Sequence, residues 1–360
     1  MEEYYCKTKI ISGTGAAETL KKMGSKRLFL VADPFFEQNG TAAKLAAASG
    51  VQQTYIFGDV TPDPTIEQVA RGTAKLKEFA PDTVVALGGG SAIDCAKAMI
   101  YFSGLSLLFA AIPTTSGSGS EVTNFSILTH NGIKHPLIDE RLQPDLAILD
   151  SDLLKNLPQS LIADGGFDVL SHALEAYVAS GAGAITDALA ADAFTTAVQA
   201  LPRSYGGSLG ARTQMHTASA MAGLAFSQAG LGLCHAMSHT LGGMFHLPHG
   251  RLNGILLPAI IGNNAKNALG KYAQLARRAG FGGAADTIAV RNLKNGLIRL
   301  RKELGMPESL AQAGVDPHLV WQNAGKIVTS TLQDPCCKTN PVQVEDFTVR
   351  RILEEVTGRG

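Results

Sequence analysis

The sequence predicts an α/β domain built on a parallel sheet, followed by an all-helical domain. Up to Asp150, short apolar runs alternate with helical patterns, which is typical of strand–helix–strand units. After Asp150 the β-branched runs thin out and one helical pattern follows another. A chain of 360 residues has room for two domains, and we expect them at residues 1–155 and 156–360.

The first half contains five apolar runs of strand length, and helical spacing follows several of them. We expect strands at residues 28–32, 54–57, 83–87, 107–112 and 146–149. A helix is expected at 65–79 and another from Ala92 onward. Continuous apolar strands separated by helices indicate a parallel sheet that is covered on both faces.

The second half shows helical periodicity throughout. We expect helices at residues 164–179, 184–201, 211–226, 231–245 and 284–304, the last of them ended by Gly305-Met306-Pro307. The apolar stretch 218–245 carries Ser, Gln, Gly and His, so it is expected to be buried helix and not a membrane span. Residues 150–160 contain no Gly/Ser linker, which predicts closely joined domains with a cleft between them.

Composition excludes several classes of protein. Lys and Arg together number 31, as do Asp and Glu, so no basic excess is present to bind nucleic acid. Hydrophobic residues make up 45% and charged residues 17%, which indicates a large core or subunit interface. The five cysteines form no CxxC motif and the N-terminus has no apolar run, so we expect reduced thiols in a cytoplasmic protein.

Two polar turns follow predicted strands and suit a dinucleotide. The strand at 83–87 enters Gly88-Gly89-Gly90-Ser91 and then a helix, whose free N–H groups attract phosphate. The loop 113–121 alternates hydroxyls and glycines after another strand. The alternatives are an ordinary tight turn and a polar surface loop, because the GxGxxG fingerprint is absent.

Asp33 ends the first predicted strand. A carboxylate there can accept hydrogen bonds from ribose hydroxyls and would repel a 2′-phosphate, which favours NAD over NADP. The alternative is a plain turn residue.

The histidines cluster in the second half. Asp168 and His172 are spaced i, i+4 on one predicted helix, and His235 and His239 repeat that spacing on another. His249 follows shortly after, as does His246. One carboxylate and three or four imidazoles on apolar helices suit a divalent transition metal with an open position for substrate. The alternative for each histidine is a hydrogen-bonded residue of the core.

Four sequence segments carry a resemblance to a known family, in which they occur in the same order along the chain. They are VVALGGGSAIDCAKA (84–98), IPTTSGSGSEVT (112–123), FDVLSHALEAY (167–177) and GLCHAMSHTLGGMFHLPHG (232–250). With them the chain resembles the iron-containing (type III) alcohol dehydrogenases over nearly its whole length. Further stretches, at 6–20, 61–66, 133–150, 226–243 and 245–250, resemble the members that serve bacterial microcompartments, and the first three of them lie outside the four motifs.

The resemblance implies a set of site residues. The implied metal ligands are Asp168, His172, His235 and His249, and the implied cofactor residues are Asp33, Gly88, Gly89, Gly90, Ser91, Thr114, Thr115, Ser118 and Lys134. His239 matches a family position near substrate and nicotinamide, and we expect it to relay a proton. The implied cofactors are NAD(H) and Fe²⁺, with Zn²⁺ as the alternative metal.

The resemblance also implies an activity. We expect a primary alcohol dehydrogenase that works mainly as an aldehyde reductase, converting propanal to 1-propanol or acetaldehyde to ethanol. It would recycle NAD in the cytoplasm or inside a microcompartment, as a homodimer or larger homo-oligomer, with shell or cargo proteins as partners and without nucleic acid or membrane.

Three alternatives remain open at this stage. One is a dehydrogenase of the same family that acts on lactaldehyde or 1,2-propanediol, on 1,3-propanediol or on glycerol. Another is a 3-dehydroquinate synthase, a lyase that shares the fold but has a different ligand set. The last is a non-catalytic microcompartment metal-binding scaffold, which would need neither cofactor loop.

The chain departs from the family pattern at a few positions. The family commonly has HGxANA after the last ligand, whereas here Arg251 follows His249-Gly250. We expect Arg251 to face solvent. Cys95 and Cys234 are expected to be packed thiols, because the metal set is complete without them.

Overall fold

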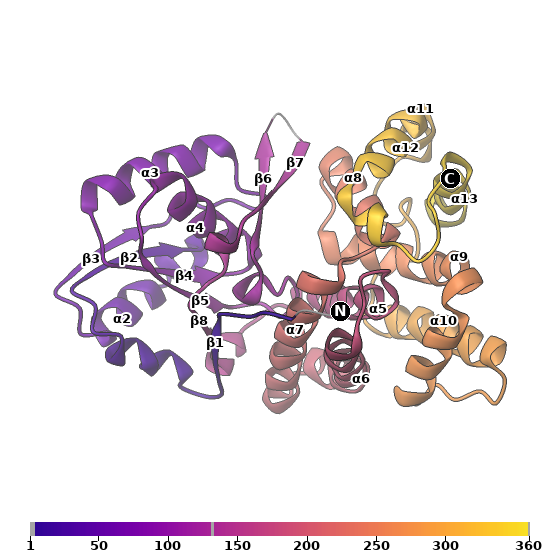
Figure 1. Cartoon of the computed structure of the whole chain (residues 1–360), viewed down its shortest axis with the longest axis horizontal. Coiled ribbons are helices and arrows are strands. Elements are labelled where there is room, and N and C mark those ends of the chain that lie inside the picture. Colours follow the sequence, from indigo (N-terminus) through magenta and orange to yellow (C-terminus); the bar gives the residue numbers. More distant parts are fainter. Residues whose placement is uncertain (1–3, 131–132, 359–360) are drawn as a thin grey trace. The chain divides into compact units, whose positions relative to one another are not determined.

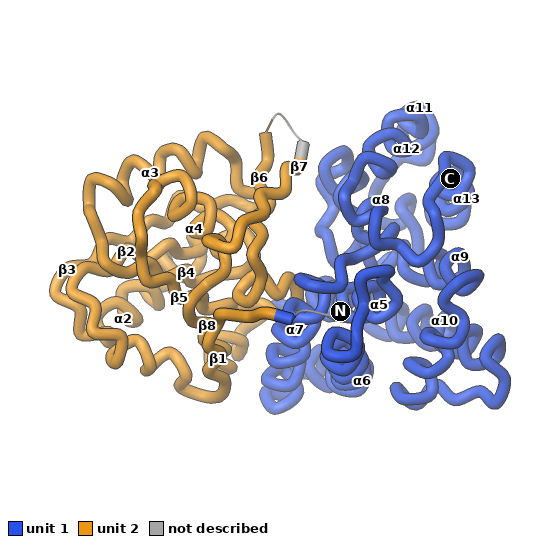
Figure 2. The backbone as a smooth tube through the Cα atoms, in the orientation of Figure 1, with its two compact units in different colours: residues 1–4, 158–360 blue, residues 5–157 orange. Residues whose placement is uncertain are grey.

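The computed structural model describes residues 4–130 and 133–358. They divide into two compact units (Figure 2). The N-terminal unit comprises Tyr5–Leu157, and the C-terminal unit begins at Pro158 and includes Tyr4. The division lies close to the boundary expected at 155/156.

The N-terminal unit is built on a six-stranded parallel sheet with the strand order β1-β8-β5-β4-β2-β3 (Figure 1). Its strands are β1 Lys9–Ser12, β2 Arg27–Ala32, β3 Gln53–Phe57, β4 Thr83–Gly88, β5 Leu108–Pro113 and β8 Leu146–Leu149. Its helices are η1 Ala16–Lys22, α1 Pro34–Gln38, α2 Thr41–Ala48, α3 Ile66–Phe79, α4 Gly90–Ser103, η2 Ser120–Val122, η3 Glu140–Leu142 and η4 Ser151–Leu154. The five predicted strands are all present.

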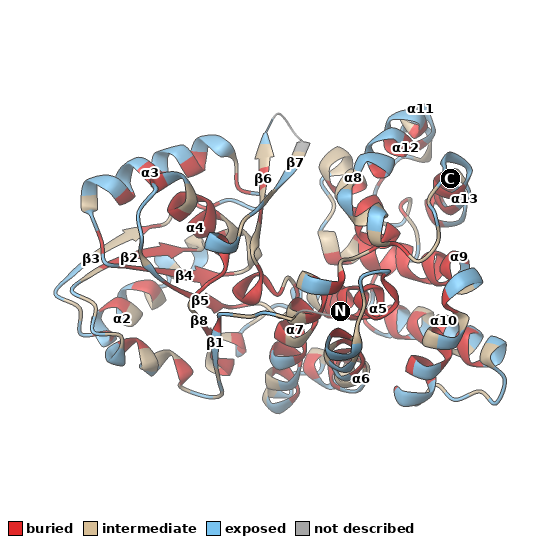
Figure 3. Ribbon diagram, viewed as in Figure 1, coloured by how far each residue is buried: buried red, intermediate tan, exposed pale blue. Residues whose placement is uncertain are grey.

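Both faces of the sheet are covered, as the continuous apolar strands predict. Successive side chains of β2 point to opposite faces: Phe29 and Val31 pack with α3 and α4, whereas Leu28 and Leu30 pack with η1 and α2. All four are at most 2% exposed. The central strands are accordingly buried along their length (Figure 3).

The strand order reverses its direction between β2 and β4. After β2 the chain moves outward to β3, and it then returns to the other side of β2 as β4 and continues to β5. In parallel sheets a ligand binds beyond the carboxyl ends of the strands at such a reversal. Asp33 follows β2 and Gly88 ends β4, so both lie at this point.

Two features of the N-terminal unit were not anticipated. Strand β1 adds to the edge of the sheet beside β8, and β6 Phe125–His130 pairs with β7 Ile133–Ile138 in a separate antiparallel hairpin. The hairpin sequences FSILTH and IKHPLI are short and mixed in polarity, and Pro136 interrupts the strand pattern. Their pairing therefore depends on the partner strand more than on local preference.

Every described element of the C-terminal unit is a helix, as predicted. They are α5 Gln159–Val178, α6 Ala184–Tyr205, α7 Leu209–Ala229, α8 Leu233–Phe245, α9 His249–Arg278, α10 Asp286–Glu303, α11 Pro317–Gln322, α12 Ala324–Gln333, η5 Pro335–Thr339 and α13 Asp346–Thr357. The stretch 218–245 is divided between α7 and α8. Among the described residues, no helix has the length and apolarity needed to cross a bilayer.

The helix α9, which is kinked at Ala268, was missed because Gly250, Gly254 and Pro258 resemble helix breakers. Pro258 has no N–H to donate to the carbonyl of Gly254, four residues earlier. The buried guanidinium of Arg301 on α10 donates to this carbonyl at 3.0 Å and to that of Ile255 at 3.4 Å. A partner from another helix thus compensates for the proline.

Arg301→Met is expected to lower the free energy of unfolding by about 1–3 kcal/mol, because it leaves these buried carbonyls without their donor. Denaturant titration measures the change. Pro258→Ala restores a backbone N–H at the same place, so the double variant should lose less than the sum of the two single changes. Additive losses would contradict this coupling.

Candidate active site

Four residues of the C-terminal unit come together around one carboxylate oxygen. The Oδ1 atom of Asp168 lies 3.8 Å from His172 Nδ1, 3.9 Å from His235 Nε2 and 3.5 Å from His249 Nε2. One donor atom from each of the four lies within 4.8 Å of the others. Two ligands of a tetrahedral metal with bonds near 2.0–2.1 Å are about 3.3 Å apart, so the cluster is nearly preformed for a metal.

Three helices supply these side chains. Asp168 and His172 are one turn apart on α5, His235 lies in the first turn of α8, and His249 is the first residue of α9. A Cβ on Gly250 would lie 1.9 Å from the carbonyl oxygen of Asp164. Glycine at 250 therefore allows the beginning of α9 to approach α5, and this approach brings His249 to Asp168.

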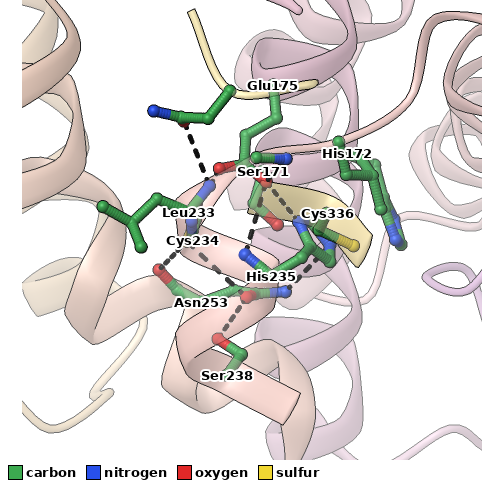
Figure 4. A network of polar contacts seen from close by, with 12 residues as sticks. Ser171, His172, Glu175, Leu233, Cys234, His235, Ser238, Asn253 and Cys336 are labelled. Carbon is green, nitrogen blue, oxygen red and sulfur yellow. Dashed lines mark hydrogen bonds and ion pairs between the residues drawn. The ribbon is translucent and has the colours of Figure 1, made fainter. Parts of the chain in front are cut away.

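Glu175 fixes the orientation of the His235 ring (Figure 4). Its carboxylate accepts a hydrogen bond from His235 Nδ1 at 2.6 Å and others from the backbone N–H groups of Gly232 and Cys234. Burial holds the pKa of His235 well below its usual value, so the ring is neutral. Burial also raises the pKa of Glu175 to about 7, against the opposing effect of the backbone donors. Because Nδ1 of His235 is hydrogen-bonded to Glu175, Nε2 is the ring nitrogen that could bind a metal.

Asn253 holds the carboxylate of Asp168 in place. Its amide Nδ2 donates to Asp168 Oδ1 at 2.9 Å. Its Oδ1 accepts from the hydroxyl of Ser238 at 2.6 Å (Figure 4). Because the Ser238 contact fixes which end of the amide is the donor, Asp168 is presented to the three histidines in one orientation.

The donor set fits a divalent transition metal. One carboxylate and three imidazoles, with His235 neutral, leave a net positive charge when a dication is bound, and oxygen and nitrogen donors of this kind suit iron or zinc. An ion that takes more than four ligands would still have a position for a substrate oxygen. These four residues could therefore hold the metal that the sequence predicts.

Glu175→Gln is expected to weaken metal binding about 10–100-fold, because an amide in this position turns an N–H₂ group toward donors that need an acceptor. Competition with a chelator measures the affinity. Glu354→Gln on the exposed face of α13 serves as the control and should leave the affinity unchanged. Equal affinity in Glu175→Gln would remove Glu175 from the metal site.

His239 lies beside the metal cluster without belonging to it. Its ring stacks on that of His249 with centroids 5.2 Å apart, and its Nδ1 donates to Asp334 Oδ2 at 2.9 Å. Burial alone would raise the pKa of Asp334, but hydrogen bonds from His239 and from the backbone N–H of Cys336 lower it below the usual value. An ionised Asp334 accepts the N–H of Nδ1, which leaves Nε2 as the ring nitrogen that is free to exchange a proton.

Sequence reasoning missed Glu175, Asn253 and Asp334. Glu175 could have been found, because it lies seven residues after Asp168 on the same helical face as His172. Asp334 had no local signal, since it is 95 residues from His239.

One expectation about this unit was wrong. Arg251 does not simply face solvent: its guanidinium pairs with Asp164 on α5 at 2.9 Å, and its side chain is 29% exposed. The pair joins the first turn of α9 to α5, close to the metal cluster. Cys234 is buried as expected and donates to the carbonyl of Asn253 at 3.8 Å, and all five cysteines are free thiols.

Several of the residues implied for the cofactor lie together in the N-terminal unit, at the end of β4. Gly88 has φ +158°, and a Cβ there would lie 3.0 Å from Cβ of Asp33. A Cβ on Gly90 would lie 3.0 Å from the hydroxyl of Ser118. Thr114 donates its backbone N–H to the carbonyl of Gly88 at 3.0 Å. The glycine turn, the second loop and Asp33 are therefore in direct contact.

The other cofactor residues have different surroundings. Ser91 is in the first turn of α4, and a Cβ on Gly89 would lie 3.3 Å from Thr115 Oγ1. Lys134 lies on the β6–β7 hairpin, where its ammonium group pairs with Asp63 at 2.7 Å. Lys134 therefore differs from the other predicted cofactor residues: it forms an ion pair with Asp63, which lies in the turn that precedes α3.

A buried lysine, which the sequence did not single out, anchors the second loop. Lys97 on α4 is fully buried and donates to the carbonyls of Thr123 at 2.9 Å and Phe125 at 2.7 Å. Burial lowers its pKa to about 8, although Asp94 and Glu121 act in the opposite direction. These bonds fix the end of the second loop on the same helix that begins at the glycine turn.

Models of one protein family match both units. Residues 7–151 match the iron-containing alcohol dehydrogenase model, and residues 162–357 match the C-terminal model of the Fe-containing alcohol dehydrogenase family. The fold matches as well: a solved structure titled 1,3-propanediol oxidoreductase is 29% identical and covers 99% of each chain, with a TM-score of 0.93.

Individual relatives match over the whole length. The 1-propanol dehydrogenase PduQ of Citrobacter freundii is 41% identical over 99% of this chain and 100% of its own. The NADPH-dependent butanol dehydrogenase of Clostridium saccharobutylicum is 36% identical over 96% of this chain and 95% of its own. The resemblance seen in the sequence is confirmed, and the protein is an oxidoreductase that belongs to the iron-containing alcohol dehydrogenase family.

Proposed function

We propose that the protein is an NAD(H)-dependent, iron-activated reductase of short aldehydes, with propanal to 1-propanol as its main reaction. The preformed cluster of Asp168, His172, His235 and His249 carries the proposal. The full-length similarity to a 1-propanol dehydrogenase supports the substrate class.

The residues of the C-terminal unit would bind the metal and move a proton. Asp168, His172, His235 and His249 would hold Fe²⁺, while Glu175 and Asn253 orient two of them. Bound Fe²⁺ would polarise the carbonyl oxygen as a Lewis acid, and bound NADH would supply the hydride. His239, with its Nδ1 bonded to Asp334, would deliver a proton from Nε2 to the oxygen of the product.

The residues of the N-terminal unit would bind NAD(H). The N–H groups at the beginning of α4 would bind the pyrophosphate, with Gly88–Gly90 allowing its close approach and Thr114, Thr115 and Ser118 on the facing loop. Asp33 would accept hydrogen bonds from the adenosine ribose, and Lys134 would contribute from the hairpin.

Steady-state kinetics of the Fe²⁺-loaded enzyme test the proposal, with NADH and aldehydes from acetaldehyde to hexanal. The highest kcat/KM is expected for propanal or acetaldehyde, with little activity in the metal-free protein. Faster reduction of lactaldehyde by NADH, or faster oxidation of 1,3-propanediol or glycerol by NAD⁺, would point to another dehydrogenase of the family. Failure to bind NADH, followed by fluorescence, would favour a metal-binding scaffold.

We also propose that the enzyme works as a homo-oligomer in the cytoplasm, inside a bacterial microcompartment. The similarity to PduQ supports this context. Size-exclusion chromatography with light scattering gives the oligomeric state. Recovery of the activity in purified microcompartments, and its release when the shell is broken, would support encapsulation, whereas activity confined to the soluble fraction would contradict it.

Asp33→Asn is expected to raise the kcat/KM ratio for NADPH over NADH about 10-fold or more. Two like charges about 4 Å apart near a protein surface repel each other by several kcal/mol, so loss of the carboxylate would admit the 2′-phosphate. The preference for NADH over NADPH needs this test because one similar protein is named an NADPH-dependent dehydrogenase.

A second variant separates charge from structure. Asp33 also caps α1 by accepting the N–H of Phe35 at 2.9 Å, and Asn preserves such a cap whereas Gly does not. Asp33→Gly should therefore show the same change in cofactor preference with lower thermal stability. An unchanged ratio in both variants would mean that Asp33 does not face the ribose.

A further inference from the structure

A second group of potential ligands lies next to the metal cluster. His239, Asp334 and Cys336 each place one donor atom within 4.8 Å of the others. Nδ1 of His239 and Oδ2 of Asp334 are 2.9 Å apart, near the roughly 3.3 Å between neighbouring ligands of a tetrahedral metal. None of the three is among the four residues assigned to the catalytic metal.

The segment that carries Asp334 and Cys336 is fixed in place. Asp334 Oδ1 caps η5 by accepting the N–H of Cys336 at 2.8 Å, which ties the two ligands together. At the end of η5, the hydroxyl of Thr339 donates to the carbonyl of Leu231 at 2.7 Å, just before the helix that bears His239. The three donors are therefore held near one another before any ion binds.

The donor types select a particular class of ion. A thiolate, an imidazole and a carboxylate together are typical ligands of Zn²⁺ and of other thiophilic dications. The cluster around Asp168 contains no sulfur. Burial and the neighbouring Asp334 raise the pKa of Cys336 well above its usual value, so an incoming metal ion has to displace the thiol proton.

We propose that His239, Asp334 and Cys336 form a second, inhibitory binding site for Zn²⁺. Coordination forms bonds from the metal to Cys336 Sγ, Asp334 Oδ2 and His239 Nδ1, with water in the remaining position. The thiol proton goes to solvent, and the proton on His239 Nδ1 moves to Nε2 or to solvent. With Nδ1 bound to the metal, the His239 ring can no longer be protonated at both nitrogens, so it cannot act as an imidazolium proton donor. The inhibition, unlike the binding, rests on the proposed role of His239.

The distance between the two clusters determines when the second site fills. The ring centroid of His239 lies 5.2 Å from that of His249 and 6.2 Å from that of His235, so two dications would repel each other. The site with four ligands fills first. Zinc therefore inhibits as an excess ion, in addition to the bound catalytic metal and not in exchange for it.

Cobalt titration of the metal-free full chain tests the binding. The first equivalent of Co²⁺ enters the sulfur-free cluster. The second should produce the intense near-ultraviolet band of a thiolate-to-cobalt charge transfer. Cys336→Ser should lose this band. Cys337→Ser is the matched control and should retain it, because the Cys337 thiol is turned toward the carbonyl of Thr331, 3.0 Å away. A wild-type protein without the band, or a band that persists in Cys336→Ser, would overturn the site.

Zinc titration of the Fe²⁺-loaded enzyme tests the inhibition, with bound iron measured in the same samples. Wild type and Cys337→Ser should lose aldehyde reduction while their iron content stays constant, and Cys336→Ser should need at least about 10-fold more zinc. Equal zinc sensitivity in Cys336→Ser, or loss of activity that follows loss of iron, would overturn the inhibitory role. A charge-transfer band without inhibition would overturn it too, and would count against proton transfer through His239.

Discussion

His235→Ala is expected to abolish tight metal binding and to lower kcat for aldehyde reduction at least about 1,000-fold. The remaining three residues would hold an ion loosely, and Glu175 would be left with a buried acceptor facing an empty space. Lewis-acid activation lowers the reaction barrier by several kcal/mol, and each 1.36 kcal/mol changes the rate tenfold. Elemental analysis after gel filtration gives the metal content, and steady-state kinetics with varied aldehyde at saturating NADH gives kcat.

Two further variants make the result specific. His249→Ala should behave in the same way although it lies on a different helix, because both rings face Asp168 Oδ1. His216→Ala on α7 removes another buried histidine that is not in the cluster, so it should retain metal while losing some stability. Full metal content and wild-type kcat in both His235→Ala and His249→Ala would refute the metal site.

His239→Ala is expected to keep metal and NADH but to slow aldehyde reduction about 100-fold, and more at high pH. A positioned proton donor contributes about 10²–10⁴-fold, and water can replace part of it. The loss grows with pH because solvent becomes a poorer proton donor. Added imidazole should restore part of the rate, since it can occupy the space that the side chain leaves.

The competing explanation is that His239 only joins α8 to η5 through Asp334. In that case His239→Ala would lower the melting temperature while leaving the pH–rate curve intact. His246→Asn provides a control on the same helix, because His246 is exposed at its C-terminal cap with φ +54° and Asn tolerates that conformation. A destabilised enzyme with an unaltered pH–rate curve would remove His239 from the mechanism.

Local patterns predicted the elements that bear the site. The run at 83–87 became β4 and Gly88–Gly90 the turn into α4, because apolar β-branched residues and glycines have strong local preferences. The i, i+4 pairs of α5 and α8 were equally visible, since helical spacing fixes which residues share a face. Helix α9 was not, because its proline is compensated by Arg301, 43 residues away in the chain (47 from the carbonyl that it binds).

By itself, the sequence determined the fold class, the family motifs and the residues that could bind a metal. The tertiary structure alone decided that Asp168, His235 and His249 converge on one oxygen, that Glu175 takes Nδ1 of His235, and that Arg251 pairs with Asp164. Periodicity acts within one element and is therefore readable from the chain. Contacts between α5, α8, α9 and η5 depend on how whole helices pack, and no local pattern encodes that packing.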